Sequence, residues 1–575
     1  MPAESPLKLV LCWHMHQPEY RDLRSGEFQL PCSYLHGTKD YVDMAAHLEA
    51  EPRARAVVNF APVLLDQIED YVGQIEGFLN NSGAIRDPLL TALAEPTLPA
   101  SVEERIALMK NCLRAHEQRL IARFPPYQRL ATIARWLADH PDAMIYAANQ
   151  LLIDLVVWHH LAWMGETVRK TDMRIARLEE QERGYTLHDR RELLQVILEL
   201  LRGTIGRYRS LAESGRIELA MSPYAHPIVP LMLDLQSAHD SMPDAPLPLA
   251  AEYPGGEQRA RWHIKQGIDT FRRHFGFAPV GCWPSEGSVS KPTLKLLTEF
   301  GFKWAASGET VLHNSLTRSN LIPGDDHGED RHRHCRHRAY RVEDTGLDCF
   351  FRDDGLSDLI GFTYSDWHAD DAVANLIHHI DNIAEVCTDR SNTVVSIILD
   401  GENAWEHYPE NGQYFLSALY RELSAHPGVE LTTYSEFLAQ RQESAPLPEL
   451  VAGSWVYGTF STWVGDADKN RGWDMLIDAK RRFDTVVASG RLDDEHVART
   501  EHQLAICEGS DWFWWFGDYN PAETVSDFER LFRLHLANLY QLLGEEPPAY
   551  LSQVFTHGSG APALGGVMRP GQESG

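Results

Sequence analysis

Short apolar runs, each followed by polar residues or proline, recur at wide intervals along the chain. They are rich in β-branched and aromatic side chains, which is typical of strands buried in a sheet. Stretches with apolar positions three and four residues apart, the pattern of amphipathic helices, separate several of these runs. This alternation predicts an α/β domain resembling a barrel. Seven or eight strands are expected, at residues 7–13, 56–60, 215–223, 281–287, 301–307, 347–351, 394–399 and 429–433.

Helical periodicity dominates residues 64–214, where we expect a helical insertion on one rim of the sheet. Residues 169–183 are mostly charged and predict a solvated helix within it. The periodicity returns between residues 441 and 556, which form a predicted C-terminal helical region after a catalytic part at residues 1–440. Residues 557–575 are rich in Gly and Pro and are expected to be a disordered tail.

The run at residues 394–399 leads directly into two carboxylates, Asp400 and Glu402. Strand residues i and i+2 point to the same side, and parallel sheets carry their chemistry at the carboxyl ends of the strands. Asp400 is therefore a candidate catalytic acid. An Asp-Gly step is also ordinary turn chemistry, and on this stretch alone the two interpretations are equally good.

The composition and net charge limit the kinds of molecule that the protein can be expected to bind. The formal charge of −29 argues against nucleic acid and anionic membranes, which require a basic surface, and is compatible with a neutral ligand. No membrane span is predicted, because polar residues interrupt the longest apolar stretch, 145–163. The N-terminus lacks the pattern of a signal peptide. The 8 cysteines are scattered without a CxxC pair, so a reducing cytoplasm is the simplest location, and export by another route is the alternative.

Two histidines, His14 and His16, follow the first predicted strand and precede Pro18. They could face a ligand, form a hydrogen-bonded pair in the core, or supply two imidazoles to a divalent ion. By themselves they favour the hydrogen-bonded pair.

Other polar and aromatic residues stand at or near strand ends. Glu218 lies inside an apolar run, where burial is costly unless the carboxylate is paired, and an outward-facing charge is the alternative. Trp283 and Glu286 flank a turn, and Trp405 follows Asp400. Asp511 opens an aromatic run, 512–516, for which a core cluster and a loop at a groove compete.

Two carboxylates near tryptophans suit glycoside hydrolysis. One carboxylate attacks or stabilises the anomeric centre, and the other, held protonated, donates to the leaving oxygen. Tryptophan rings cover the apolar faces of sugars, and the chain has 15 of them. No glycine-rich phosphate loop or nucleotide fingerprint competes with this interpretation.

The motifs together resemble those of glycoside hydrolase family 57, over nearly the whole chain. Five of them stand in the order of that family: His14-Met-His-Gln-Pro18, Gly215-Arg-Ile-Glu218, Trp283-Pro-Ser-Glu286, Asp400-Gly-Glu-Asn-Ala-Trp405 and Asp511-Trp-Phe-Trp514. The resemblance implies an incomplete seven-stranded barrel followed by a helical region, and activity on α-glucans with retention of anomeric configuration.

By the same resemblance Glu286 is the nucleophile and Asp400 the general acid/base, and the reaction needs no metal or other cofactor. The residues expected to line the sugar subsites are His14, His16, Glu218, Trp283, Trp405, Asp511 and Trp514. Two stretches depart from the pattern: residues 307–309 lack an expected Asp-Glu, and the His- and Arg-rich segment 325–338 has no counterpart and is predicted to be a solvated loop.

Several functions stay open at this point. The form of the first motif favours an α-amylase, amylopullulanase or 4-α-glucanotransferase over a branching enzyme. A metal-dependent polysaccharide deacetylase or α-mannosidase-like hydrolase requires a third ligand facing His14 and His16. A non-catalytic glucan-binding protein is the weakest alternative, because both carboxylates are present. Linkage preference, chain length and oligomeric state do not follow from the sequence.

Overall fold

A computed structural model describes residues 5–322, 336–387, 389–441, 443–517, 520, 522–556 and 558. The strands form one ten-stranded sheet in the order β10-β6-β7-β5-β4-β3-β2-β1-β8, with β9 beside β1. A continuous parallel run makes up most of it: β7 (Asp348–Phe351), β5 (Trp304–Ser307), β4 (Gly281–Cys282), β3 (Ile217–Met221), β2 (Ala56–Phe60), β1 (Leu7–Met15) and β8 (Val394–Asp400).

This parallel run curls until its outer strands approach each other. A backbone hydrogen bond of 2.8 Å joins Asp353 N, just after β7, to Ser396 O in β8. Successive residues of β1 alternate between two buried clusters. Val10 joins a small one with side chains from five other strands, and Leu11 joins the large core shared with the helices. The curled sheet is therefore buried on both faces, as the apolar runs predicted.

The α/β class and the eight predicted strands are confirmed, including β9 (Val429–Leu431). The expected number of strands is too low, however, because β6 (Tyr340–Val342) and β10 (Ala445–Leu447) extend one edge. Each has three residues, and so short a segment carries too little alternation to be recognised.

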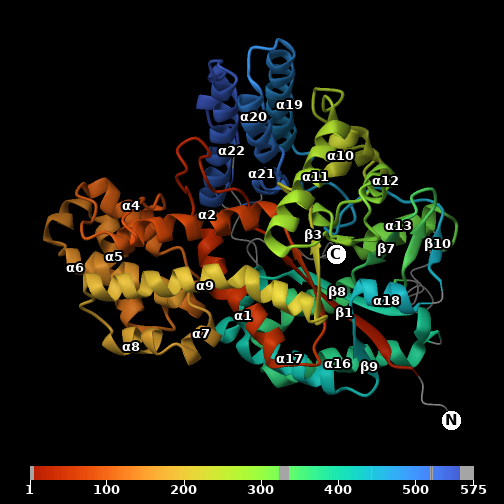
Figure 1. Cartoon of the computed structure of the whole chain (residues 1–575), viewed down its shortest axis with the longest axis horizontal. Helices are drawn as coiled ribbons and strands as arrows, with labels where there is room; N and C mark the ends of the chain where they lie inside the picture. The colour runs from red at the N-terminus through yellow and green to blue at the C-terminus, as the bar shows by residue number, and fades with distance from the viewer. Residues whose placement is uncertain are drawn as a thin grey trace.

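Helices occupy residues 62–213 and form the left-hand part of the molecule in Figure 1. This part begins with α2 (Pro62–Leu79) and ends with the long α9 (Leu187–Glu213), which returns the chain to the sheet. A capping box between Thr186 and Asp189 starts α9. Between them lie α3 (Pro88–Ala94), α4 (Val102–Cys112), α5 (Pro125–Asp139), α6 (Asn149–Ala162), α7 (Glu166–Thr171) and α8 (Met173–Gln181).

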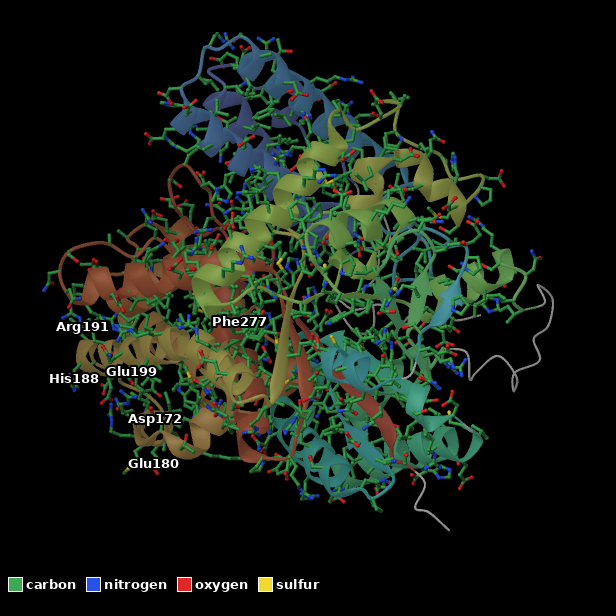
Figure 2. All side chains as sticks on the ribbon, turned by 45° about the vertical axis from the view of Figure 1, so that its right-hand side comes forward. Asp172, Glu180, His188, Arg191, Glu199 and Phe277 are labelled. Atoms are coloured by element: carbon green, nitrogen blue, oxygen red, sulfur yellow. The ribbon has the colours of Figure 1, made fainter. Side chains whose placement is uncertain are left out.

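The charged stretch predicted as a solvated helix is α7 and α8. Asp172 and Glu180 lie at the outer edge of the molecule, far from the sheet (Figure 2). Arg174 binds both Asp172 and Glu199 of α9, while Ile175 and Leu178 pack inward. The segment is thus an amphipathic helix with a charged outer face.

A second group of helices lies at the top of Figure 1. It contains α19 (Ala467–Ala488), α20 (Asp494–Cys507), α21 (Ser510–Trp515) and α22 (Ala522–Leu542). The aromatic run after Asp511 is therefore a short helix and not a loop. Trp512 and Phe513 are buried in the core, so the core interpretation is correct for them and the loop interpretation is wrong.

Most of the His- and Arg-rich segment, residues 325–335, lies outside the described residues, as do residue 557 and residues 559–575 of the expected tail. Residues 336–338 are described and are not solvated as predicted. His337 is buried against Asp353 at 2.8 Å, and Arg336 binds Glu309. Among the described residues no helix has both the length and the apolar composition needed to cross a bilayer.

Candidate active site

A cavity of about 860 Å³ opens at the carboxyl ends of β1, β7 and β8. Glu286 and Asp400 both line it, although they are far apart in the sequence. The helical insertion contributes Lys110 and Arg114 to its wall, and the C-terminal helices contribute Trp514. Three separate regions of the chain therefore build one site.

Glu286 lies in a tight turn directly after β4. Its backbone is left-handed, with φ +58°, and Gly287 follows with φ +57°. A Cβ at Gly287 would come within 2.8 Å of the Trp283 ring, so this turn requires glycine. Ser307 Oγ donates to Gly287 O at 2.6 Å from the neighbouring strand. A left-handed glutamate costs free energy and persists here because the surrounding contacts hold it.

Trp455 holds the Glu286 side chain in place. The indole Nε1 donates to Glu286 Oε2 at 3.0 Å, and Trp455 N donates to Glu286 O at 3.1 Å. His226 Nδ1 lies 3.8 Å from the other carboxylate oxygen, Oε1. Trp455 therefore fixes both the backbone and the carboxylate of Glu286 on the cavity wall.

Asp400 stands at the end of β8, level with His14 in β1. Asn403 Nδ2 donates to Asp400 Oδ2 at 2.8 Å. Burial raises the pKa of Asp400 above its ordinary value, and the bond from Asn403 opposes that rise. Raising this pKa favours the protonated form that a general acid requires.

Glu402 is more deeply buried than Asp400. Gln17 Nε2 donates to Oε1 at 3.1 Å, and His16 N donates to the same oxygen at 3.3 Å, while Oε2 has no hydrogen-bond partner among the described residues. Burial, and then the charge of Asp400, raise the pKa of Glu402 well above 4.5. Both carboxyls of this strand end therefore favour protonation.

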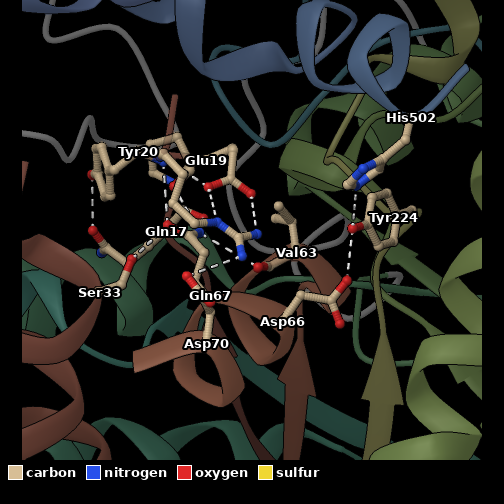
Figure 3. A network of polar contacts seen from close by, with 12 residues as sticks. Gln17, Glu19, Tyr20, Ser33, Val63, Asp66, Gln67, Asp70, Tyr224 and His502 are labelled. Carbon is tan, nitrogen blue, oxygen red and sulfur yellow. Dashed lines mark hydrogen bonds and ion pairs between the residues drawn. The ribbon is translucent and has the colours of Figure 1, made fainter. Parts of the chain in front are cut away.

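The loop after β1 is fixed by the network in Figure 3. Gln67 of α2 accepts from Tyr20 N at 3.2 Å and from Ser33 Oγ at 2.9 Å, and it donates to Pro18 O at 2.9 Å. Tyr20 OH in turn donates to Gln17 Oε1 at 3.0 Å. Because Gln17 binds Glu402, α2 indirectly positions that carboxyl.

Three imidazoles line up beside the carboxylates. His226 stacks on His16 at 3.9 Å and on His14 at 5.0 Å. His14 Nδ1 bonds Asn59 Oδ1 at 2.7 Å, and its Nε2 bonds His226 Nε2 at 3.1 Å. Burial, and then the charge of His16, lower the pKa of His14 to about 3, so this ring is neutral. His14 is thus a buried hydrogen-bonded residue that also lines the cavity.

The C-terminal helices complete this histidine group. Asp511 Oδ1 bonds His16 Nε2 at 2.8 Å, and Ser510 Oγ bonds His226 Nδ1 at 2.9 Å. Ligand atoms of His16, His226 and Asp511 lie within 4.8 Å of one another, so the trio could hold a cation. Its ligand atoms already satisfy one another and their neighbours, with His16 Nδ1 as the unpaired exception among the described residues. The donor set is therefore explained without an ion.

A buried ion pair anchors this segment to the barrel. Glu508, three residues before Asp511, accepts from Arg259 Nη2 at 2.8 Å and from His263 Nε2 at 2.8 Å, and it also binds Tyr253. Burial acts to raise the pKa of Glu508, but the charge of Arg259 and the hydrogen bonds from His263 and Arg259 together outweigh it and lower the pKa to about 2. Ser510 N then donates to His226 O at 2.9 Å, which joins α21 to the loop after β3.

Three residues expected in the subsites do not line the cavity. Glu218 is near the amino end of β3, where Trp304 Nε1 donates to it at 2.7 Å and Ser435 N at 2.9 Å. Trp283 is fully buried and packs edge-on against Trp455 at 5.2 Å. Trp405 is also buried, with Nε1 donating to Gly401 O at 2.9 Å. These three side chains contact neighbouring residues of the fold and do not line the cavity.

Other residues at the site were not expected from the sequence. Trp455 lines the cavity, and His226 is buried beside Glu286 without lining it; both lie in loops whose patterns indicated no role. Arg352 follows the predicted strand 347–351 and binds Ile398 O, Asp354 and Asp358, with its guanidinium 5.5 Å from the Trp455 ring. The strand-end position of Arg352 was the only signal that could have found it. Glu309 lies in the stretch 307–309, which lacks the expected Asp-Glu. It binds Arg336 and does not line the cavity.

The chain is similar to known proteins in sequence and in fold. The model of glycosyl hydrolase family 57 matches residues 10–448. The 1,4-α-glucan branching enzyme of Thermococcus kodakarensis is 22% identical over 409 residues, which are 59% of this chain and 56% of that enzyme. The chain thus spans little more than half the length of this relative.

Solved structures with the same fold have low sequence identity. A branching enzyme from Pyrococcus horikoshii has a TM-score of 0.56 at 15% identity, covering 93% of this chain and 89% of its own. The α-amylase AmyC from Thermotoga maritima has a TM-score of 0.53 at 12% identity, covering 94% and 93%. A 4-α-glucanotransferase from Thermococcus litoralis has a TM-score of 0.50 at 14% identity, covering 93% and 60%.

Proposed function

The chain belongs to glycosyl hydrolase family 57, and from that premise we propose that it cleaves α-glucans with retention of configuration, Glu286 acting as nucleophile and Asp400 as general acid/base. The observation that carries this proposal is the position of both carboxyls on the wall of one cavity. Their surroundings also differ. Trp455 Nε1 donates a hydrogen bond to the Glu286 carboxylate, while burial raises the pKa of Asp400 and favours the protonated form of a general acid.

The first step transfers the glucosyl unit to the protein. Glu286 attacks the anomeric carbon, the glycosidic bond breaks, and the proton of Asp400 moves to the departing oxygen. The bond from Trp455 Nε1 keeps Glu286 Oε2 occupied and orients the carboxylate. In the second step Asp400 takes a proton from water or a sugar hydroxyl, which attacks the anomeric carbon and releases Glu286.

Hydrolysis of starch-like glucans, as by an α-amylase or amylopullulanase, is the first candidate for the specific activity. The first motif, His14-Met-His-Gln-Pro18, resembles that of the α-amylase, amylopullulanase and 4-α-glucanotransferase members more than that of the branching enzymes. Transfer to a second glucan is the other candidate. It is supported by the sequence match to a branching enzyme, which concerns only part of that enzyme. The two candidates share the glucosyl-enzyme and differ in the molecule that resolves it.

The products from soluble starch, pullulan and maltotriose, separated side by side, test the proposal. Release of reducing ends alone indicates hydrolysis, and oligomers longer than maltotriose indicate transfer. Glu286→Gln serves as the control against a contaminating amylase. The absence of products from all three glucans, with folded protein, would contradict the proposed function.

Two observations disfavour a metal-dependent polysaccharide deacetylase. The chain belongs to another family, and hydrogen bonds already engage His16, His226 and Asp511. We expect dialysis against a strong chelator to leave the activity on starch unchanged. Loss of activity that returns with zinc or another divalent ion would instead assign this trio to a metal.

A further inference from the structure

One histidine on the cavity wall has no place in the mechanism above. His36 lies in α1 (Cys32–Ala50) and lines the same cavity as Glu286 and Asp400. Its Nδ1 bonds Asp40 Oδ2 at 2.7 Å, one turn further along the helix. Its ring stands perpendicular to Trp163, with centroids 5.4 Å apart. The ring is therefore held on two sides.

Asp40 is itself fixed by charged and polar neighbours. It is fully buried, and Lys39 Nζ donates to Asp40 Oδ1 at 2.6 Å. The same ammonium group donates to Asn411 Oδ1 at 2.8 Å and lies 5.1 Å from the Trp163 ring. A buried carboxylate with a lysine beside it is an acceptor, so His36 Nδ1 carries the proton of this hydrogen bond.

This arrangement determines what the other ring nitrogen can do. With Nδ1–H donated to Asp40, Nε2 is the ring nitrogen left for a ligand. No hydrogen bond to Nε2 is present among the described residues, and that nitrogen is not enclosed by protein. Because the ring lines the cavity, Nε2 is preorganised to bond a hydroxyl group in it.

α1 lies against the segment that follows Asp400 in the chain. Lys39 Nζ donates to Asn411 Oδ1 at 2.8 Å, and Asn411 Nδ2 donates to Asp43 Oδ2 at 3.2 Å. Glu286 is held by other elements, through Trp455 and His226. In the proposed mechanism the departing chain lies on the side of Asp400, and by microscopic reversibility an incoming acceptor takes the same place.

We propose that His36, held by Asp40, is a substrate-binding residue whose Nε2 forms a hydrogen bond with a hydroxyl of the glucan on the leaving-group and acceptor side. This inference rests on the proposed function and deepens it. By binding the sugar acceptor, His36 would favour transfer over hydrolysis, because a bound acceptor competes with water for the glucosyl-enzyme.

The test uses α-maltosyl fluoride as donor and maltose as acceptor. Fluoride leaves as a small ion, so formation of the maltosyl-enzyme requires no sugar on the acceptor side. Fluoride release without maltose reports donor use, and transfer product against maltose concentration reports acceptor binding. The variants are His36→Phe and the milder His36→Gln, with His47→Gln as matched control, a buried histidine of the same helix that does not line the cavity.

We expect His36→Phe to raise the maltose concentration for half-maximal transfer about tenfold, the effect of one lost hydrogen bond. His36→Gln should fall between it and the wild type, and His47→Gln should match the wild type. Fluoride release without maltose should change less than about twofold, since that step does not use the acceptor side.

An unchanged dependence on maltose in both His36 variants would overturn the inference, as would equal losses in fluoride release and transfer, which indicate a structural role. If His36→Phe does not fold, His36→Gln alone decides between these outcomes. A wild-type protein that folds but releases no fluoride contradicts the proposed function itself, and a wild type that reacts while the variants match it contradicts only the role of His36.

Discussion

Asp400 and Glu402 are two carboxyls at the end of one strand, and their surroundings separate their roles. Asp400 lines the cavity at the level of His14 and accepts a hydrogen bond from Asn403. Glu402 lines it too but is more deeply buried, and it receives two hydrogen bonds from the loop after β1. We infer that Asp400 exchanges protons with the substrate and that Glu402 positions this loop.

Asp400→Asn should lower kcat on starch by about 10²–10⁴-fold, because the leaving oxygen loses its proton donor. With α-maltosyl fluoride the rate of the first step in Asp400→Asn should stay close to that of the wild type, since fluoride needs no general acid. Glu402→Gln keeps the hydrogen-bonding shape of a protonated carboxyl and should cost less than about tenfold. The measurement is initial rates on both substrates. A larger loss for Glu402→Gln than for Asp400→Asn would exchange the two roles.

The raised pKa of Glu402 also makes a prediction about stability. In the folded state this carboxyl holds its proton above the ordinary glutamate value of 4.5, where the unfolded chain has lost it. The folded state then binds more protons than the unfolded state, so the free energy of unfolding falls as pH rises through this window. Glutamine cannot ionise, so Glu402→Gln should escape that loss.

Thermal midpoints at pH 5 and pH 8 measure this effect. The midpoint of Glu402→Gln should exceed that of the wild type by about 2 °C or more at pH 8 and approach it at pH 5. Glu299→Gln, which removes an exposed carboxylate of α12 (Lys291–Glu299), is the control and should keep the pH dependence of the wild type. Parallel curves for Glu402→Gln and the wild type would show that Glu402 is ionised throughout.

At the scale of elements, the junction of α20 and α21 connects the C-terminal helices to the histidine group. Glu508 is buried at this junction and binds Arg259 and His263 of α11 (Gly256–Phe275). Two and three residues later, Ser510 and Asp511 bond the imidazoles of His226 and His16. A substitution at Glu508 should therefore disturb the histidines of the active site.

Glu508→Gln should lower the free energy of unfolding by about 3–5 kcal/mol, because it leaves the Arg259 guanidinium buried without its counter-charge. It should also lower kcat on starch, since α21 loses its anchor. Glu299→Gln, whose partner Arg261 lies on the surface of the same α11, is the matched control and should leave both quantities nearly unchanged. Urea unfolding and initial rates provide the readouts. An effect no larger than that of the control would contradict the anchoring role.

At the scale of the whole molecule, the sheet, the helical insertion and the C-terminal helices all contribute to one cavity within a chain of net charge −29. That charge would repel an anionic substrate at low ionic strength, and it exerts no long-range force on a neutral glucan.

We expect kcat/KM on a neutral maltooligosaccharide to change less than about twofold between 0.05 and 0.5 M NaCl, because the encounter involves no net charge on the substrate. Carboxymethyl starch of similar length serves as the charged comparison, and its kcat/KM should rise with salt as repulsion is screened. A steep salt dependence for the neutral substrate would show that an ionic interaction controls binding.

The sequence by itself determined the class of the fold, the positions of eight of the ten strands and the family, because buried strands and the motifs after them leave local patterns. It also indicated the strand-end carboxyls Glu286 and Asp400. Only the tertiary structure decided which neighbours face the cavity. Glu218 stands at the amino end of its strand, and Trp283 and Trp405 turn into the core. Alternation reports which residues share a face of a strand, and it does not report which residues from other segments cover that face. For the same reason Trp455, His226 and His36 emerged only when the curled sheet brought separate segments together around one cavity.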